Sequence, residues 1–225
     1  MKALLCFLFF AQASAAEKSC SEAFTSIYSN LEWGVAEDGD PSSGWGSFPV
    51  NASAYMEFLT NFIRSNDIHD VVDLGCGTWE FSRYIDWSGV NYVGVDVVEQ
   101  VVQLNQKKFG AANIHFVQGD ILAMSLPAGD LMICKDVLQH LQHADIQTFL
   151  KKIKQYKHCL LTNDLAISFT DSVDRTKSNR ENEYRGRNRP LDLTKPPFNI
   201  KGSKVLSYPI GDHIKQVLYI RNDSL

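Results

Sequence analysis

The sequence lacks the cysteine patterns that mark zinc sites and redox centres. Its five cysteines include no C-x-x-C pair and no cluster with histidine at the spacing of zinc ligands. Three of them, Cys76, Cys134 and Cys159, lie in or beside segments expected to be buried strands, where a thiol usually acts as a small apolar side chain. The sequence therefore predicts neither a metal site nor a disulfide framework.

Positive charge is also scarce. The chain has 26 acidic and 22 basic residues, a net charge of −4, whereas proteins that bind nucleic acid or anionic membranes usually present a basic face. Beyond the N-terminus, no run approaches the ~20 apolar residues of a membrane-spanning helix. We therefore expect no nucleic-acid partner and no membrane attachment of the mature chain. The pattern specifies no oligomeric state.

The N-terminus has the three parts of a secretory signal peptide. Met1-Lys2 is positively charged, residues 3–12 are almost wholly apolar, and Ala13-Ser14-Ala15 is an A-x-A cleavage pattern. This predicts a signal peptide over residues 1–15 and a protein that is secreted or delivered to a secretory compartment or periplasm. The alternatives are an uncleaved anchor and a misplaced start codon. The cysteines resemble those of a cytosolic fold, so the two signals disagree.

Length and composition fit a single domain with a helical N-terminal segment. The chain has 225 residues, of which 44% are hydrophobic and 21% charged, as in ordinary globular proteins. Residues 16–66 contain two expected helices, 20–31 and 52–64, the second with aromatic and leucine side chains at helical spacing. Between them, residues 33–49 form a loop rich in glycine, serine and tryptophan. Such a loop is either a connector or a lid that closes over a ligand.

The main domain, residues 67–225, shows strands alternating with helices. Expected strands are 71–74, 92–96, 114–117, 131–134 and 159–162, with helices from about 79 and over 100–108. A single long helix is expected after the fourth strand, with one apolar stripe formed by Leu138, Leu141, Ile146, Phe149, Leu150 and Ile153. After a polar, arginine-bearing segment, a hairpin is expected from strands 205–208 and 216–220. The predicted fold is α/β: a doubly wound, seven-stranded, mostly parallel sheet closed by an antiparallel strand pair.

The first expected strand ends in a glycine-rich turn. Gly75 and Gly77 allow the chain to turn sharply and let a ligand lie close to the backbone. Asp96 ends the second strand about 20 residues later, where an acidic side chain can accept hydrogen bonds from ribose hydroxyls. A glycine turn with a surface aspartate is the alternative. The combination of strand, turn, strand and terminal aspartate favours a nucleotide site.

The residues after the turn argue against a dinucleotide. A pyrophosphate site requires a third glycine and an open helix N-terminus, but Trp79 and Glu80 follow Gly77. Asp73 adds a carboxylate just before the turn. These features suit a ligand that carries an ammonium and a sulfonium better than they suit a nicotinamide dinucleotide.

Four segments resemble the Rossmann-like (class I) S-adenosylmethionine-dependent methyltransferases. They are Val72-Asp73-Leu74-Gly75-Cys76-Gly77, Gly94-Val95-Asp96-Val97, Gln118-Gly119-Asp120-Ile121 and residues 130–141, and the resemblance covers roughly residues 68–164. It implies that the glycine turn holds the methionine part of S-adenosylmethionine, Asp96 the ribose, and Asp120 with Ile121 the adenine. Many members have a third glycine where Trp79 stands, so the expected start of the following helix departs from the family pattern. The residues expected to bind the cofactor are Asp73, Gly75, Cys76, Gly77, Asp96, Val97, Asp120, Ile121 and Lys135.

Two residues after the fourth strand are catalytic candidates. The methyl group on a sulfonium is already activated, so a base is needed only where the acceptor must lose a proton. His140 is a candidate base, a residue that shapes the cofactor pocket, or an ordinary helical residue. Asp136 either orients a substrate or cofactor, or caps a helix.

The acceptor is expected at the same end of the sheet. Trp45 in the loop, Asn163 after the fifth strand, and Arg185 and Arg189 in the arginine-bearing segment are the substrate candidates. Arginines in this segment either grip an anionic or aromatic acceptor or belong to a solvated loop.

The sequence thus predicts an S-adenosylmethionine-dependent methyltransferase that acts on a small molecule or a protein side chain. A non-catalytic nucleotide-binding or interaction protein with the same fold is the alternative. A nicotinamide-dependent oxidoreductase is disfavoured by the missing third glycine.

Overall fold

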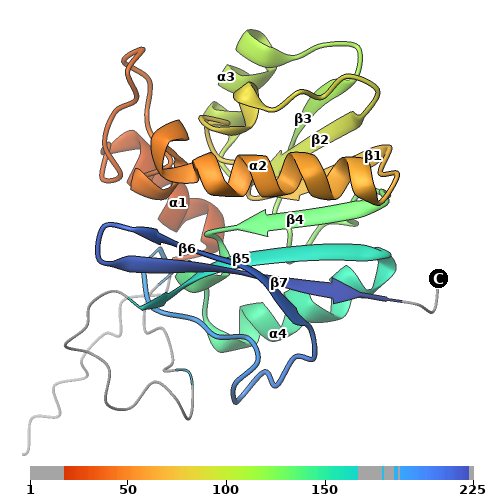
Figure 1. Ribbon diagram of the computed structural model, residues 1–225. Coiled ribbons are helices and arrows are strands. Elements are labelled where there is room, and N and C mark those ends of the chain that lie inside the picture. The colour runs from red at the N-terminus through yellow and green to blue at the C-terminus, as the bar shows by residue number, and fades with distance from the viewer. Residues whose placement is uncertain (1–17, 167–178, 180–184, 187, 223–225) are drawn as a thin grey trace, which may run out of the picture.

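The computed structural model describes residues 18–166, 179, 185–186 and 188–222 of the chain (Figure 1). The predicted signal peptide, residues 1–15, lies outside this range. Among the described residues, no helix is both long and apolar enough to cross a membrane.

The described elements alternate along most of the chain. The helices are α1 (Cys20–Ser29), α2 (Pro49–Ser65), α3 (Glu99–Phe109) and α4 (His143–Lys152), with short 3₁₀ turns at Trp45–Ser47, Ser82–Tyr84, Leu138–His140 and Ile153–Gln155. The strands are β1 (Asp70–Leu74), β2 (Asn91–Asp96), β3 (Ile114–Gln118), β4 (Leu131–Lys135), β5 (His158–Ala166), β6 (Ser203–Ile210) and β7 (His213–Arg221).

The strands form one seven-stranded sheet with the order β3-β2-β1-β4-β5-β7-β6. The first five strands pair in parallel, and β7 pairs antiparallel with both β5 and β6. The order reverses at β1 and β4, which are paired neighbours, so a cleft is expected where their carboxyl ends point. The predicted fold class, including the closing hairpin, is confirmed.

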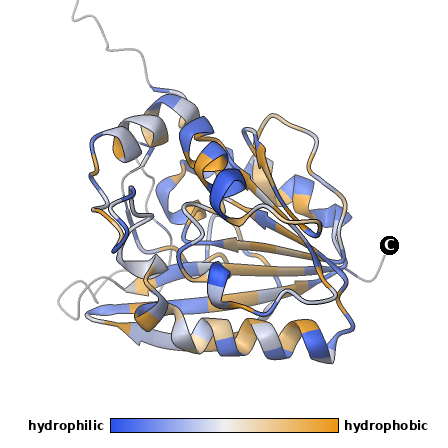
Figure 2. Cartoon of the chain, turned by 90° about the horizontal axis from the view of Figure 1, so that it is seen from above, coloured by the Kyte–Doolittle hydropathy of each residue, from blue (hydrophilic) through white to orange (hydrophobic). Residues whose placement is uncertain are grey.

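Helices cover both faces of the sheet. In Figure 1, α2 crosses the near face and α4 lies behind β5 and β7. Buried side chains of α2, such as Tyr55 and Leu59, pack on one face, while those of α1 and α4, such as Phe24 and Phe149, pack on the other. Figure 2 shows mostly orange strands between helices that carry both colours, as expected for helices that bury a single stripe.

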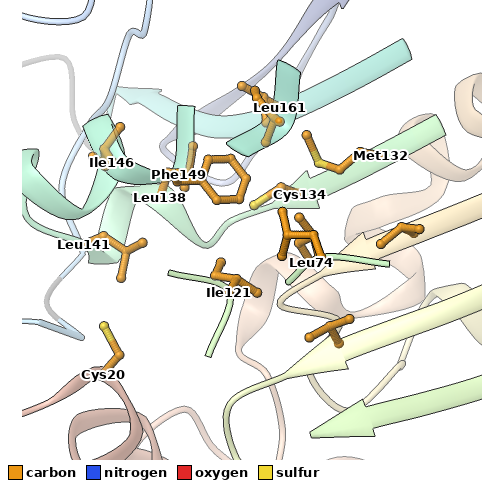
Figure 3. Packing of buried hydrophobic residues seen from close by; sticks show 14 of the residues in the cluster. Cys20, Leu74, Ile121, Met132, Cys134, Leu138, Leu141, Ile146, Phe149 and Leu161 are labelled. Carbon is orange, nitrogen blue, oxygen red and sulfur yellow. The ribbon is translucent and has the colours of Figure 1, made fainter. Parts of the chain in front are cut away.

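The core beneath α1 and α4 is built from aliphatic, aromatic and sulfur side chains. Figure 3 shows Leu74, Met132 and Cys134 from the strands facing Leu138 and Phe149 from the segment after β4. The four described cysteines, Cys20, Cys76, Cys134 and Cys159, are all buried and free. Cys76, Cys134 and Cys159 are thus buried, as the sequence predicted. The described residues contain no disulfide.

The helix predicted from about Trp79 is wrong. Only the 3₁₀ turn Ser82–Tyr84 follows β1 before β2 begins. Trp79 has a φ of 58°, in the left-handed region, and its ring is buried against Tyr92, Phe109 and Phe116 at centroid distances of 5.1–5.5 Å. Tertiary packing of this ring holds a backbone conformation that glycine would adopt at lower cost.

The single long helix predicted after the fourth strand is also wrong. A 3₁₀ turn at Leu138–His140 comes first, the chain then extends at Leu141, and α4 begins only at His143. Asp136, just before this turn, has a φ of 60°, which a continuous right-handed helix does not allow. The apolar residues predicted to form one stripe are still buried, because both pieces pack on the same core.

Candidate cofactor and acceptor site

A cavity of about 300 Å³ opens at the carboxyl ends of the parallel strands. Every residue predicted to bind the cofactor lines it, as do both catalytic candidates and one predicted substrate residue, Trp45. The ninth cofactor candidate, Lys135, pairs with Asp136 in the other half of this cavity, and the remaining eight define one half. We call this the cofactor half and define it as Asp73, Gly75, Cys76, Gly77, Asp96, Val97, Asp120 and Ile121.

The glycine turn forms the floor of the cofactor half. Gly75 and Gly77 have φ values of 80° and 54°. A Cβ atom at Gly75 would overlap Val137, and one at Gly77 would overlap Ser43. Both the backbone conformation and the close contacts therefore require glycine at these two positions.

Asp96 is fixed directly beside this turn. Its carboxylate accepts hydrogen bonds from the backbone amides of Gly77 and Val98, both at 3.0 Å. Burial raises the pKa of Asp96, and hydrogen bonds from backbone amides act in the opposite direction. A carboxylate has about four acceptor sites, so Asp96 retains capacity to accept from a ribose hydroxyl.

Asp73 is a buried carboxylate whose pKa is raised to about 7. Burial is the main cause, and the hydrogen bond from the Tyr92 hydroxyl at 2.7 Å opposes it. Among the described residues, no basic side chain forms an ion pair with Asp73 or Asp96. A cationic ligand beside Asp73 would stabilise the ionised carboxylate, so this donor set suits a sulfonium and an ammonium.

The loop between α1 and α2 closes over the cavity, and several polar contacts hold it there. The Ser43 hydroxyl accepts a hydrogen bond from the Thr78 amide at 2.7 Å and contacts the Tyr28 hydroxyl at 2.8 Å. The Gly46 carbonyl accepts one from Lys135 at 2.8 Å. Trp45 remains 59% exposed, yet a methyl group on Gly211 would come within about 3.0 Å of its ring. The loop therefore spans the cavity from the glycine turn to the β6–β7 hairpin.

The opposite half of the cavity contains a buried ionic network. We call it the acceptor half and define its core as Lys135, Asp136, Asp164, His213 and Lys215. Lys135 pairs with Asp136 at 2.5 Å, and Lys215 pairs with both Asp136 and Asp164 at 2.7 Å. Burial alone would raise the pKa of Asp136, but the two lysines outweigh it and hold that pKa at about 2. Asp136 is thus a fixed anion rather than the helix cap considered from sequence.

His140 faces the cavity in its neutral form. Burial lowers its pKa to about 4, and Nδ1 lies 3.1 Å from the Gly186 carbonyl. The imidazole also packs against Phe24 and Trp33 with ring centroids 6.3 and 5.2 Å apart. His140 therefore forms part of the cavity wall, between aromatic side chains.

Three predicted substrate residues do not line the cavity. Asn163 shares a strand face with Leu161, which packs in the core under α4, because alternate residues of β5 point to opposite faces. Arg185 makes a forked ion pair with Asp145 at 2.8 and 3.0 Å. Arg189 is buried and donates to the Leu141 carbonyl at 2.8 Å. Both arginines therefore anchor their segment to the helix region after β4.

Several cavity residues, above all His213 and Lys215 in β7, were not predicted from the sequence. The burial of Lys215 could have been predicted, because it is two residues from the fully buried Val217 and residues two apart share a strand face. Phe24 and Trp33 were also missed as walls of the cavity. Their contribution depends on how α1 and the loop fold back over the sheet. Within the described part of the chain, no group of three or more metal-ligating side chains is present.

One family model matches the central region of the chain. Residues 71–157 match the model of a family described as a methyltransferase domain. This range includes the glycine turn, Asp96 and Asp120. None of the curated proteins matches the sequence.

Solved structures with the same fold are numerous, and several of them cover most of this chain. The magnesium protoporphyrin IX methyltransferase (ChlM) of Synechocystis PCC 6803, with bound SAH, is 13% identical with a TM-score of 0.63; the match covers 89% of this chain and 98% of that one. The N-methyltransferase NodS of Bradyrhizobium japonicum WM9, in complex with S-adenosyl-l-homocysteine, is 17% identical with a TM-score of 0.61; the match covers 88% and 99%. At these identities the similarity is one of fold.

Proposed function

Because residues 71–157 form a methyltransferase domain on the class I methyltransferase fold, we propose that this chain is an S-adenosylmethionine-dependent methyltransferase. The observation that carries the proposal is the cofactor half of the cavity. There a two-glycine turn, a strand-end aspartate and a buried carboxylate with no ion-pair partner among the described residues meet in one place.

Each part of the cofactor half has a proposed partner on the ligand. The turn from Gly75 to Gly77, with Asp73, holds the methionine part, Asp96 the ribose hydroxyls, and Asp120 with Ile121 the adenine. When bound, S-adenosylmethionine supplies a methyl group already activated by its sulfonium. The remaining task of the protein is to align an acceptor with the sulfur–methyl bond and exclude water.

We propose a small molecule or a single protein side chain as the acceptor. Two features of the cavity support this choice. Its volume of about 300 Å³ is at the small end for ligand sites, and the loop bearing Ser43 and Gly46 covers it. The net charge of −4 also disfavours a nucleic-acid acceptor.

Asp136 and His140 have different proposed roles. Asp136 is held by two lysines, so it contributes a fixed negative charge near the acceptor rather than a base. His140, with a pKa of about 4 and aromatic neighbours, shapes the wall of the pocket.

Calorimetric titration of the full-length chain tests the cofactor assignment. We expect micromolar binding of S-adenosylmethionine and S-adenosylhomocysteine, no binding of NAD, and loss of both interactions in Asp96→Ala. The matched control is Asp86→Ala, because Asp86 is an exposed residue outside the cavity. A folded chain that binds neither compound would contradict the proposal and favour a non-catalytic interaction protein.

Turnover is tested separately by the release of S-adenosylhomocysteine in the presence of pooled small molecules and short peptides. Release that depends on a pool supports an enzyme and identifies the class of acceptor. Cofactor binding with no release from any pool would favour a binding protein that has kept the fold.

We also propose that the chain is exported. The support is the charged start, the apolar run and the A-x-A pattern of residues 1–15. Mass spectrometry of the exported protein should find Ala16 as its first residue. Recovery of the intact chain from the cytoplasm alone would contradict export.

A further inference from the structure

Two cavity-lining histidines have different partners. His140 contacts a backbone carbonyl and two aromatic rings, whereas Nδ1 of His213 lies 3.3 Å from a carboxylate oxygen of Asp164. The side chain of Asp164 is only 1% exposed, while that of His213 is 27% exposed and lines the cavity. The proposed function assigns no role to this histidine–aspartate pair.

Asp164 is held firmly by its neighbours. Its Oδ2 accepts hydrogen bonds from the amides of Gln139 at 3.2 Å and Asn188 at 3.1 Å, and Oδ1 pairs with Lys215 at 2.7 Å. Its backbone amide donates to the Gln139 side chain at 2.7 Å. The carboxylate therefore has a fixed position from which to orient an imidazole.

The 3.3 Å distance between Nδ1 of His213 and the Asp164 carboxylate favours one tautomer of the imidazole. A carboxylate beside Nδ1 favours the tautomer with hydrogen on Nδ1, which leaves a lone pair on Nε2. A neutral imidazole in that tautomer is a proton acceptor, and the carboxylate stabilises the imidazolium that forms.

Asp136 and Lys215 are less suitable proton acceptors than this imidazole. Both carboxylate oxygens of Asp136 are paired with lysines, and Lys215 is held protonated because Asp136 and Asp164 outweigh the effect of its burial and raise its pKa. The charged groups around His213 are Asp164 from β5, Lys215 from its own strand and Asp212 in the adjoining turn.

We propose that His213 is a catalytic residue that takes the proton of the methyl acceptor and that Asp164 is its positioning residue. The inference rests on the proposed methyltransferase function and narrows the acceptor to an O–H or N–H nucleophile. The acceptor oxygen or nitrogen bonds to the methyl carbon, the carbon–sulfur bond breaks with its electron pair staying on sulfur, and the acceptor proton passes to Nε2 of His213.

Nuclear magnetic resonance of the full-length, isotopically labelled protein tests this pair without knowledge of the acceptor. Long-range ¹⁵N spectra report the tautomer, and the His213→Gln variant assigns the signals. We expect hydrogen on Nδ1 in the wild type and a loss of that preference in Asp164→Asn. A wild-type His213 with hydrogen on Nε2 would overturn the proposal, because it would lack the lone pair that accepts the proton.

The second readout compares bound S-adenosylmethionine with S-adenosylhomocysteine, which lacks the sulfonium charge. If Nε2 faces the methyl group, the pH at which half of His213 is protonated should be lower with S-adenosylmethionine by about one pH unit. His69 is the internal control, because it precedes β1 at the opposite end of the sheet. An identical midpoint with both ligands would overturn the proposal. Failure of cofactor binding appears separately, as unchanged spectra with either ligand.

Discussion

The two halves of the cavity hold their carboxylates differently. In the cofactor half, Asp73 and Asp96 are buried and receive hydrogen bonds from a tyrosine hydroxyl and backbone amides. In the acceptor half, Asp136 and Asp164 are also buried or nearly so, but both pair with Lys215. The pKa of Asp73 is accordingly raised to about 7, while that of Asp136 is lowered to about 2.

This difference indicates which half attracts positive charge. A buried, ionised carboxylate without a paired cation is stabilised when a cationic ligand binds, because the ligand replaces the hydration that the carboxylate lost on burial. A carboxylate already paired with lysine gains little. The cofactor half is therefore suited to a sulfonium ligand, and the acceptor half is a preorganised frame that positions other groups.

Removing the shared cation should have the largest effect. Lys215→Met leaves Asp136 with one fewer partner and Asp164 without its lysine, so we expect the free energy of unfolding to fall by about 3–5 kcal/mol. Urea denaturation at pH 7 measures this. The control is Lys204→Met, which breaks an exposed pair with Asp192 and should cost less than about 1 kcal/mol. Equal losses in the two variants would show that the acceptor half is not held by its ion pairs.

Neutralising Asp73 should have the opposite effect on stability. The pKa of Asp73 is about 7 in the folded chain and about 3.8 when unfolded, so its contribution to stability is full below pH 3.8 and lost as pH rises through 7. Asp73→Asn should therefore raise the free energy of unfolding by up to about 4 kcal/mol at pH 8 and leave it nearly unchanged at pH 4. Urea denaturation at the two pH values tests this, and a loss of stability at pH 8 would contradict it.

Cofactor affinity should depend on the same proton. Below pH 7 the carboxyl group of Asp73 must lose a proton before it can pair with a cation. Affinity for S-adenosylmethionine should therefore rise up to about tenfold per pH unit towards pH 7 and level off above it. Calorimetry across this range measures the effect, with Asp73→Asn as the pH-independent comparison. A wild-type affinity that stays constant with pH would contradict the role of Asp73.

The contact between the loop and the glycine turn should contribute least. Ser43→Ala removes the hydrogen bonds to Thr78 and Tyr28, and the loss of about 1 kcal/mol corresponds to roughly fivefold weaker cofactor binding. The matched control is Ser53→Ala in α2, whose hydroxyl donates to the Val50 carbonyl in the exposed first turn of the same helix and whose loss should leave affinity unchanged. Equal affinity of the wild type and Ser43→Ala would show that the loop does not support the cofactor half.

The cofactor half could be predicted from the sequence because its residues follow consecutive strands. The apolar strands, the glycine turn and Asp96 lie within one continuous stretch, and parallel strands bring their carboxyl ends together. The backbone at Trp79, where the sequence suggested a helix, could not be predicted. Its left-handed backbone depends on packing against Phe109 and Phe116, which come from later elements.

The acceptor half was harder to predict because β7 is antiparallel and distant in sequence. His213 and Lys215 reach the cavity only because β7 inserts between β5 and β6. Asn163 was predicted to contact the substrate, but its neighbour Asp164 lines the cavity, because the opposite side of β5 faces it. That cannot be read from a strand with polar residues at both positions.

A crystal structure of the full-length chain with S-adenosylhomocysteine tests the central claim most directly. We expect the ribose hydroxyls within hydrogen-bond distance of Asp96, the adenine beside Asp120 and Ile121, and the amino acid part at the turn next to Asp73. A nucleoside bound in the acceptor half, or outside the cavity altogether, would contradict it.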